Sequence, residues 1–259
     1  MIKFCNLYSG SSGNSTYIES SNAKILIDAG VSCKKITDAL NSISVSIADL
    51  NGILVSHEHS DHIKGIEVIC KKYSIPVYAT KKTWKAMNNL NIADNQKLIF
   101  TPENEFQIND LLILPFSIPH DAIDPCGFSI FNETKKITIA TDIGHIDEDL
   151  LKKMYASDIL LIESNYDKDT LICGSYPYML KKRIQSDVGH LSNEMTGKAL
   201  KTLHENGVNN IILGHLSKEN NFPELAYQTC LNELNNCCCS IPFNLSVAKR
   251  DEIDDIITL

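Results

Sequence analysis

The amino-acid sequence predicts a mixed α/β protein built in layers. Short apolar runs of strand length alternate with stretches of helical periodicity along the whole chain. Several of the predicted strands end in a histidine, an aspartate or a glutamate. A rhythm of strands followed by helices also recurs coarsely in each half, without a repeat of fixed period. Such an alternation of elements is typical of layered α/β architectures.

Length and composition limit the possible classes of protein. The 259 residues, of which 43% are hydrophobic, can bury a packed core, and no low-complexity linker divides them. We therefore expect one domain over 1–259. No apolar run is long enough to cross a bilayer, and the start lacks the regions of a secretory signal, which indicates a cytoplasmic protein without a membrane partner. The nine cysteines, three of them at 237–239, are expected to be reduced.

Short strands separated by turns are expected in the first half of the chain. The glycines and small polar residues of 9–14 predict a turn, which serves either as a plain hairpin loop or as a backbone nest for an anion. Asp28 ends the third strand and could brace the segment that follows the next one, while Ser32 caps a helix. The other expected elements are strands at 2–8, 15–19, 23–27, 53–55, 76–79, 97–101 and 105–108, and a helix at 81–88.

The second half continues the alternation, and its strands lead to polar residues. The buried strand 111–118 precedes His120, and the strand 136–141 precedes Asp142. Two further strands, 159–162 and 210–213, lead to Glu163 and His215. The remaining expected elements are strands at 127–132 and 245–248 and helices at 150–155, 178–184, 192–205 and 223–234.

The segment His57-Glu58-His59-Ser60-Asp61-His62 holds four ligand-type side chains directly after a buried strand. In an extended stretch alternate side chains share a face, so His57 and His59 point the same way. The apolar spacing over 63–73 predicts that a helix begins at the end of the segment. This change of backbone geometry can direct one pair of ligands at one metal and the next pair at a neighbouring metal.

The segment resembles the HxHxDH signature of the metallo-β-lactamase superfamily. The rest of the chain supplies a histidine, an aspartate and a final histidine in the order which that family uses, so the resemblance covers nearly the whole sequence. It implies an α/β fold, the four-layer αββα metallo-β-lactamase sandwich of two similar halves, with the site at the joined strand ends. It also implies that one metal is bound by His57, His59 and His120 and the other by Asp61, His62 and His215, with Asp142 bridging both.

This ligand set favours two divalent metal ions. Five imidazoles and two carboxylates without a thiolate suit zinc best, and manganese or iron would also be accepted. A hydroxide shared by the metals would be the nucleophile. By this resemblance, most metallo-β-lactamases proper lack a metal-binding histidine beside the aspartate, and they often use a cysteine. His62 therefore indicates the nuclease and glyoxalase-like branches.

Two residues between Asp142 and His215 indicate which of these two branches the chain resembles. Glu163 and the Gly-His-Leu-Ser segment around His190 resemble an arrangement in the RNase Z group of transfer-RNA processing endonucleases. The resemblance implies that Glu163 orients His190 as the general acid, and Asp61 is counted with them among the catalytic residues. The alternative is a helix-capping or core histidine. With the 9–15 and 163–167 segments, the chain looks most like the YycJ/VicX (WalJ) group, for which exonuclease action on DNA is implied.

The sequence therefore predicts a dinuclear metal-dependent hydrolase that cleaves phosphodiester bonds, with a nucleic acid, above all DNA, as its substrate. A small-ester or thioester hydrolase of the glyoxalase II type and a non-catalytic regulatory module are the alternatives. The net charge of −8 argues against a large electropositive surface. The basic runs at 71–72 and 181–183 are more typical of solvated helix faces than of nucleic-acid contacts. DNA versus RNA, the polarity of digestion and the oligomeric state stay open.

Overall fold

The structure, a computed structural model, describes residues 1–235 and 242–259. The chain divides into two compact units. Unit 1 comprises Met1–Ser117, Ala122–Thr134 and Lys249–Leu259, and unit 2 comprises Ile118–Asp121 and Lys135–Ala248. The cysteine triplet at 237–239 lies outside the described residues.

Unit 1 contains a seven-stranded sheet in the order β14-β1-β2-β3-β4-β5-β6. Strands β1 to β3 are antiparallel and β3 to β6 are parallel, so the carboxyl ends of β3 and β4 lie at one edge of the sheet. This edge positions the polar segments that follow both strands. The bounds are β1 Lys3–Tyr8, β2 Ser15–Glu19, β3 Lys24–Ile27, β4 Gly52–Leu54, β5 Val77–Thr80, β6 Lys97–Phe100 and β14 Ile257–Thr258.

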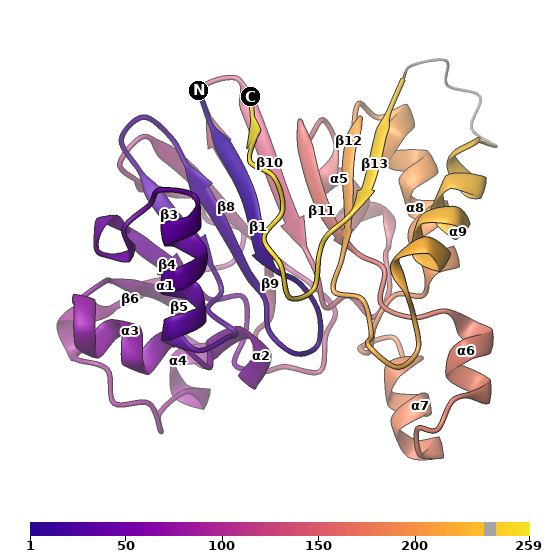
Figure 1. The fold of residues 1–259 in the computed structure, drawn as a ribbon, viewed down its shortest axis with the longest axis horizontal. Coiled ribbons are helices and arrows are strands. Elements are labelled where there is room, and N and C mark those ends of the chain that lie inside the picture. Colours follow the sequence, from indigo (N-terminus) through magenta and orange to yellow (C-terminus); the bar gives the residue numbers. More distant parts are fainter. Residues whose placement is uncertain (236–241) are drawn as a thin grey trace. The chain divides into compact units, whose positions relative to one another are not determined.

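Short helices (Figure 1) complete this part of unit 1. Their apolar side chains pack with those of the strands in one cluster. Ser32 caps α1 through the amide of Lys35, as the sequence predicts. Ile36 and Leu40 of α1 join the strands in a shared core. The helical segments are α1 Cys33–Ser42, η1 Ile47–Asp49, α2 Ser60–Ile63, α3 Ile66–Tyr73, α4 Lys81–Ala86 and η2 Asp94–Gln96.

The helix expected after the histidine segment is interrupted at Gly65. Two helices, α2 and α3, replace it. The Gly65 amide donates to the carbonyl of Ala29, 2.8 Å away, and a Cβ at Gly65 would lie only 2.4 Å from the carbonyl oxygen of Val31. The chain therefore approaches the neighbouring loop too closely for any other residue at this point.

Unit 1 also contains an antiparallel meander whose aromatic side chains meet the first sheet. The meander consists of β7 Phe106–Ile108, β8 Leu111–Ser117 and β9 Cys126–Asn132. Phe100 of β6 stacks on Phe106 with ring centroids 5.6 Å apart and meets Phe128 edge-on at 5.7 Å. Within this unit two sheets thus pack face to face over an apolar layer.

Unit 2 contains four parallel strands, β10 Lys135–Ala140, β11 Ile159–Glu163, β12 Asn210–Gly214 and β13 Asn244–Val247. Its helices are α5 Glu148–Met154, α6 Lys168–Cys173, α7 Tyr178–Ile184, α8 Asn193–Glu205 and α9 Pro223–Asn235. The last two lie side by side (Figure 1). Ser192 caps α8 through the amide of Met195. Because the strands are parallel, the residues that follow them are delivered to one edge of the sheet.

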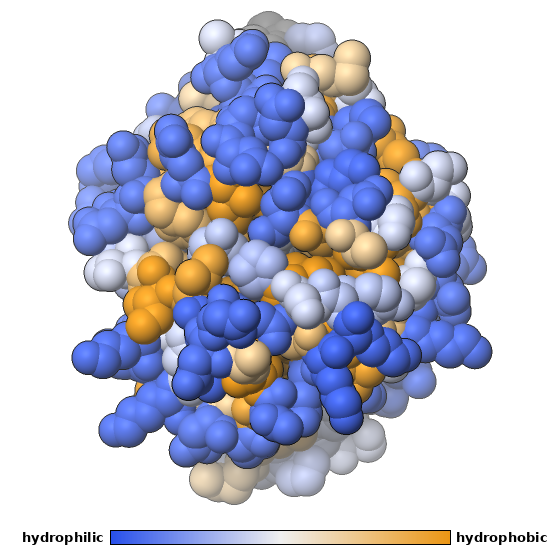
Figure 2. All heavy atoms as spheres, turned by 90° about the vertical axis from the view of Figure 1, so that its left-hand side faces the viewer, coloured by the Kyte–Doolittle hydropathy of each residue, from blue (hydrophilic) through white to orange (hydrophobic). Residues whose placement is uncertain are grey.

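The surface is largely polar where Figure 2 shows it. Hydrophilic side chains cover most of this face, and apolar ones form separate smaller patches. Among the residues that the structure describes, no helix combines the length and the apolar character needed to cross a membrane.

Candidate metal centre

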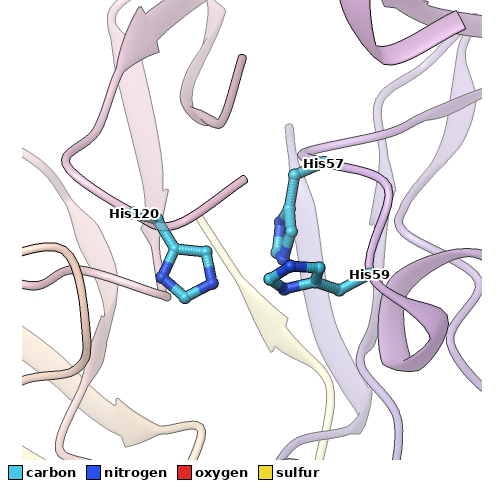
Figure 3. A group of neighbouring side chains, drawn as sticks. All are labelled: His57, His59 and His120. Atoms are coloured by element: carbon cyan, nitrogen blue, oxygen red, sulfur yellow. The ribbon is translucent and has the colours of Figure 1, made fainter. Parts of the chain in front are cut away.

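Three histidines of unit 1 lie together in the segment after β4, two of them before α2 and His62 within it. The ring centroids of His57 and His59 are 4.6 Å apart, and those of His57 and His62 are 4.0 Å apart. Figure 3 shows His57 and His59 extending from this segment, and His120 extending from the segment after β8. His57 and His62 are fully buried. Buried imidazoles grouped in this way are the ligands that zinc and other divalent transition metals prefer.

Asp28 supports this segment from the end of β3. Its carboxylate accepts hydrogen bonds from the Ser56 amide at 2.8 Å, from the Ser56 hydroxyl at 2.7 Å and from Nδ1 of His62 at 2.7 Å. Nδ1 of His62 therefore carries the hydrogen, which places the lone pair on Nε2. That nitrogen lies 3.5 Å from Oδ2 of Asp61. Two adjacent ligand-type atoms thus converge in unit 1.

The 9–14 turn holds the same segment through its backbone. The Asn14 amide donates to the carbonyl of Asp61 at 2.8 Å, and the Gly30 amide donates to the carbonyl of Asn14 at 2.8 Å. A Cβ at Gly30 would lie 1.7 Å from the Asp61 carbonyl oxygen, so only glycine fits there. The amides of Gly10 and Gly13 also donate within the turn. These bonds favour a bracing role for the turn over an anion nest.

Replacing Asp28 with asparagine is expected to weaken metal binding by about 10- to 100-fold. Asparagine tolerates the left-handed backbone of this position, where φ is 62°, but its amide has one acceptor oxygen for three donors. Competition with a chromophoric chelator would measure the affinity. Asp38→Asn on the exposed face of α1 is the matched control. Equal affinities of the two variants would show that Asp28 does not orient a ligand.

His120 belongs to unit 2 and is held by the segment before α8. Its Nδ1 donates to the carbonyl of Gly189 at 3.1 Å, so Nε2 is the nitrogen available for a metal. Burial lowers the pKa of His120, against the opposing charge of Asp142. A histidine that stays neutral at physiological pH is suited to bind a cation.

Asp142 follows β10 and lies between two histidines of unit 2. Its Oδ1 is 3.7 Å from Nε2 of His120 and 3.5 Å from Nε2 of His215. Two ligands of one tetrahedral metal, bound at about 2.1 Å, are about 3.4 Å apart. One oxygen of Asp142 thus has ligand-like spacing to each of the two histidines.

Glu163 ends β11 and binds two histidines through one oxygen. Its Oε1 accepts hydrogen bonds from Nδ1 of His190 at 2.8 Å and from Nδ1 of His215 at 2.7 Å. Its Oε2 accepts hydrogen bonds from the backbone amides of Ile143 at 2.8 Å and Leu191 at 3.1 Å. Complete burial acts to raise the pKa of Glu163, but His190 and His215 outweigh it and hold the pKa well below its ordinary value. Glu163 is therefore an anion that fixes both imidazoles.

His190 is the more accessible of the two histidines bound by Glu163. Its side chain is 16% exposed, whereas that of His215 is 1% exposed. Ligand-type atoms of His190, Glu163, Asp142 and His215 lie within 4.8 Å of one another. This geometry allows two roles for His190, a metal ligand or a proton donor to a substrate.

The structure thus groups the predicted residues within each unit. Unit 1 contains one set, His57, His59, Asp61 and His62, and unit 2 contains the other, His120, Asp142, Glu163, His190 and His215. Imidazole and carboxylate groups of this kind are compatible with divalent metals. Sequence reasoning missed the contact of Glu163 with His215 and the contacts of Asn14 and Ser56. The clearest available signal was the glutamate at the end of an otherwise apolar strand.

Comparison with known proteins places these residues in a family context. A model described as the beta-lactamase superfamily domain matches residues 23–216. Exodeoxyribonuclease WalJ of Streptococcus pneumoniae strain D39 is 43% identical over 237 residues, which cover 90% of this chain and 88% of that protein. Exodeoxyribonuclease YycJ of Bacillus anthracis is 39% identical over 227 residues, which cover 87% of this chain and 86% of that protein.

Solved structures with the same fold are more distant in sequence. Zinc-bound PqqB from Methylobacterium extorquens superposes with a TM-score of 0.74 at 14% identity, covering 98% of this chain and 99% of that one. The short form of human tRNase Z superposes with a TM-score of 0.66 at 16% identity, covering 99% of this chain and 100% of that one. These similarities confirm the predicted metallo-β-lactamase fold.

Proposed function

This chain belongs to the β-lactamase superfamily and is a metal-dependent hydrolase, and we propose that it cleaves the phosphodiester bonds of DNA as an exonuclease. The observation that carries the proposal is its identity of 43% and 39% to two proteins named exodeoxyribonucleases, over nearly 90% of the chain. At this level of identity over nearly full length, a shared reaction class is the simplest expectation. For an enzyme of DNA we propose a cytoplasmic location, and for 1–259 a single functional domain.

The proposed cofactors are two divalent metal ions, zinc first, with manganese or iron as alternatives. One would be held by His57, His59 and His120 and the other by Asp61, His62 and His215, with Asp142 between them. The fit is supported within unit 2 by the spacing of Asp142 to its two histidines, and within unit 1 by the spacing of Asp61 to His62. When bound, such ions supply a hydroxide nucleophile at neutral pH and neutralise the phosphate charge.

The remaining roles fall to residues of the chain itself. The leaving oxygen of a phosphodiester is an alkoxide, which departs readily only when it receives a proton. Nδ1 of His190 is held by Glu163, so its other ring nitrogen can present a proton to that oxygen. Glu163 also stabilises the charged imidazolium before the transfer. We assign His190 as the general acid and Glu163 as the residue that positions it.

The test is a degradation assay on end-labelled single- and double-stranded DNA and RNA. The full chain would be supplied with zinc or manganese, and bound metal would be measured on the same sample. We expect stepwise shortening of DNA, loss of cleavage with a chelator and recovery when metal is returned. The position of the label that survives longest gives the polarity.

Two outcomes would contradict the proposal. A metal-loaded protein that cleaves none of these substrates would exclude a nuclease, and turnover of a glutathione thioester in the same sample would support the glyoxalase II alternative. A protein with full metal content and no turnover of any ester would support the non-catalytic alternative.

A further inference from the structure

The hairpin of α6 and α7 in unit 2, residues 168–184, exposes an unusual group of apolar side chains. Tyr178 is 67% exposed, Met179 74% and Ile172 60%, and Val188 in the following loop is 44% exposed. The hairpin does not need these side chains for its own packing. Its small core is made by other residues, namely Tyr166, Leu171 and Ile184 with Tyr176 and Leu180 against them. Exposed apolar groups of this kind indicate a binding surface.

Basic groups border the exposed tyrosine. The ammonium of Lys182 lies 4.9 Å from the ring centroid of Tyr178. The ammonium of Lys181 donates to the carbonyls of Ile172 and Gly174, both at 2.7 Å, which ties it to α6. A pocket of about 240 Å³ between the two helices is lined by Ile172, Tyr178, Lys181, Lys182 and Gln185. An aromatic ring and two ammonium groups thus share one concave surface.

The hairpin is joined directly to the candidate catalytic residues of unit 2. The backbone amide of His190 donates to the carbonyl of Ile184 at 2.9 Å. A Cβ at Gly189 would lie 2.3 Å from the carbonyl oxygens of Arg183 and Ile184, so the His190 loop is pressed against the end of α7. The guanidinium of Arg183 pairs with Asp121, the neighbour of His120. The C-terminal end of α7 therefore contacts the segments that carry His120 and His190.

We propose that the α6–α7 hairpin binds a single-stranded segment of the nucleic-acid substrate next to the scissile bond. Tyr178 stacks on a base, and Lys181 and Lys182 contact phosphates on either side of it. The proposal rests on the proposed nuclease function and names the surface that holds its substrate. Base stacking on an aromatic ring beside a positively charged track is the general mode of sequence-tolerant single-strand binding.

Charge complementarity favours a nucleic acid over an apolar partner. The chain carries a net charge of −8, yet three consecutive basic residues, Lys181, Lys182 and Arg183, lie on this one helix. The sequence alone favours a solvated face for this run. The ammonium of Lys182 beside the exposed Tyr178 ring, with Lys181 lining the same pocket, is what indicates phosphates and bases instead.

Binding to metal-loaded protein tests the proposal without turnover. The probe is a fluorescent phosphorothioate oligonucleotide of about 20 nucleotides, which resists cleavage, in a DNA and an RNA form. We expect Tyr178→Ala to weaken binding about fivefold or more and Tyr178→Phe to bind as the wild type does. Lys182→Gln should reduce the slope of log affinity against log salt by about 0.7, one phosphate contact. Lys198→Gln, on the exposed face of α8, is the charge control.

The outcomes separate this proposal from the nuclease proposal. Wild-type-like affinity and salt slope in both Tyr178→Ala and Lys182→Gln would overturn the binding surface, whatever the cleavage assay shows. Failure of the wild type to bind either the DNA or the RNA oligonucleotide would also overturn the binding surface. Tyr178→Ala should also raise KM for DNA. If the wild type binds as expected but cleaves no nucleic acid, only the nuclease proposal fails.

Discussion

Asp142→Asn is expected to reduce DNA cleavage by about 10³-fold or more while the protein stays folded. The carboxylate of Asp142 lies between the ring nitrogens of His120 and His215, at 3.7 and 3.5 Å. The substitution removes the negative charge that would hold two cations close together, and metal assistance contributes several kcal/mol to such a reaction. Asparagine is preferred to alanine because it tolerates the left-handed φ of 61° at this position.

The measurement combines kcat/KM on end-labelled DNA with the metal content of the same protein. We expect Asp142→Asn to bind fewer than two metal equivalents. Asp149→Asn provides the control, because that carboxylate lies on α5 with its side chain 89% exposed. Full metal content with undiminished cleavage in Asp142→Asn would show that this residue is not a bridging ligand.

The convergence of ligands in unit 2 could be predicted from the sequence. The apolar runs before Asp142, Glu163 and His215 have strand length, and helices separate them. Parallel strands connected through helices deliver their carboxyl ends to one edge, so the residues after β10, β11 and β12 had to lie close together. The family resemblance added the roles of these residues, which stay predictions.

Features that depend on close tertiary approach could not be predicted. Asp28, Asp142 and His215 all adopt left-handed φ angles, of 62°, 61° and 53°, within two residues of the end of a strand. Nothing in their neighbouring sequence requires this conformation, which the surrounding contacts impose. Gly30 and Gly65 likewise reveal their purpose only through the backbone atoms that a Cβ would strike.

The helix α6 was absent from the predicted elements for a related reason. It spans only Lys168–Cys173, and Leu171 is its one buried residue. Asp167 caps it through the amide of Thr170. Its periodic signal is too short to detect, and it is stabilised by packing on the cluster that includes Tyr166 and Ile184. The part of the Tyr178 surface that α6 contributes, at Ile172, could therefore not be predicted from the sequence.

His190→Ala is expected to lower cleavage of DNA by about 10²- to 10⁴-fold, the usual contribution of a general acid. The alkoxide that leaves from DNA needs a proton, and the imidazole fixed by Glu163 at 2.8 Å is placed to give it. Bis(p-nitrophenyl) phosphate has a leaving group that departs as a stable anion. We therefore expect its hydrolysis by His190→Ala to stay within about tenfold of the wild type.

This contrast between substrates decides between the two roles that the geometry allows His190. If His190 is instead a metal ligand, its removal would lower the metal content and slow both substrates alike. The conservative variant His190→Gln separates lost proton transfer from lost packing, because glutamine retains a hydrogen-bonding side chain but cannot act as an acid. His145→Ala is the control, since that histidine bonds to the carbonyl of Asp187 in the same loop without contacting Glu163. Equal losses on DNA and on the aryl ester, with metal retained, would contradict general-acid catalysis by His190.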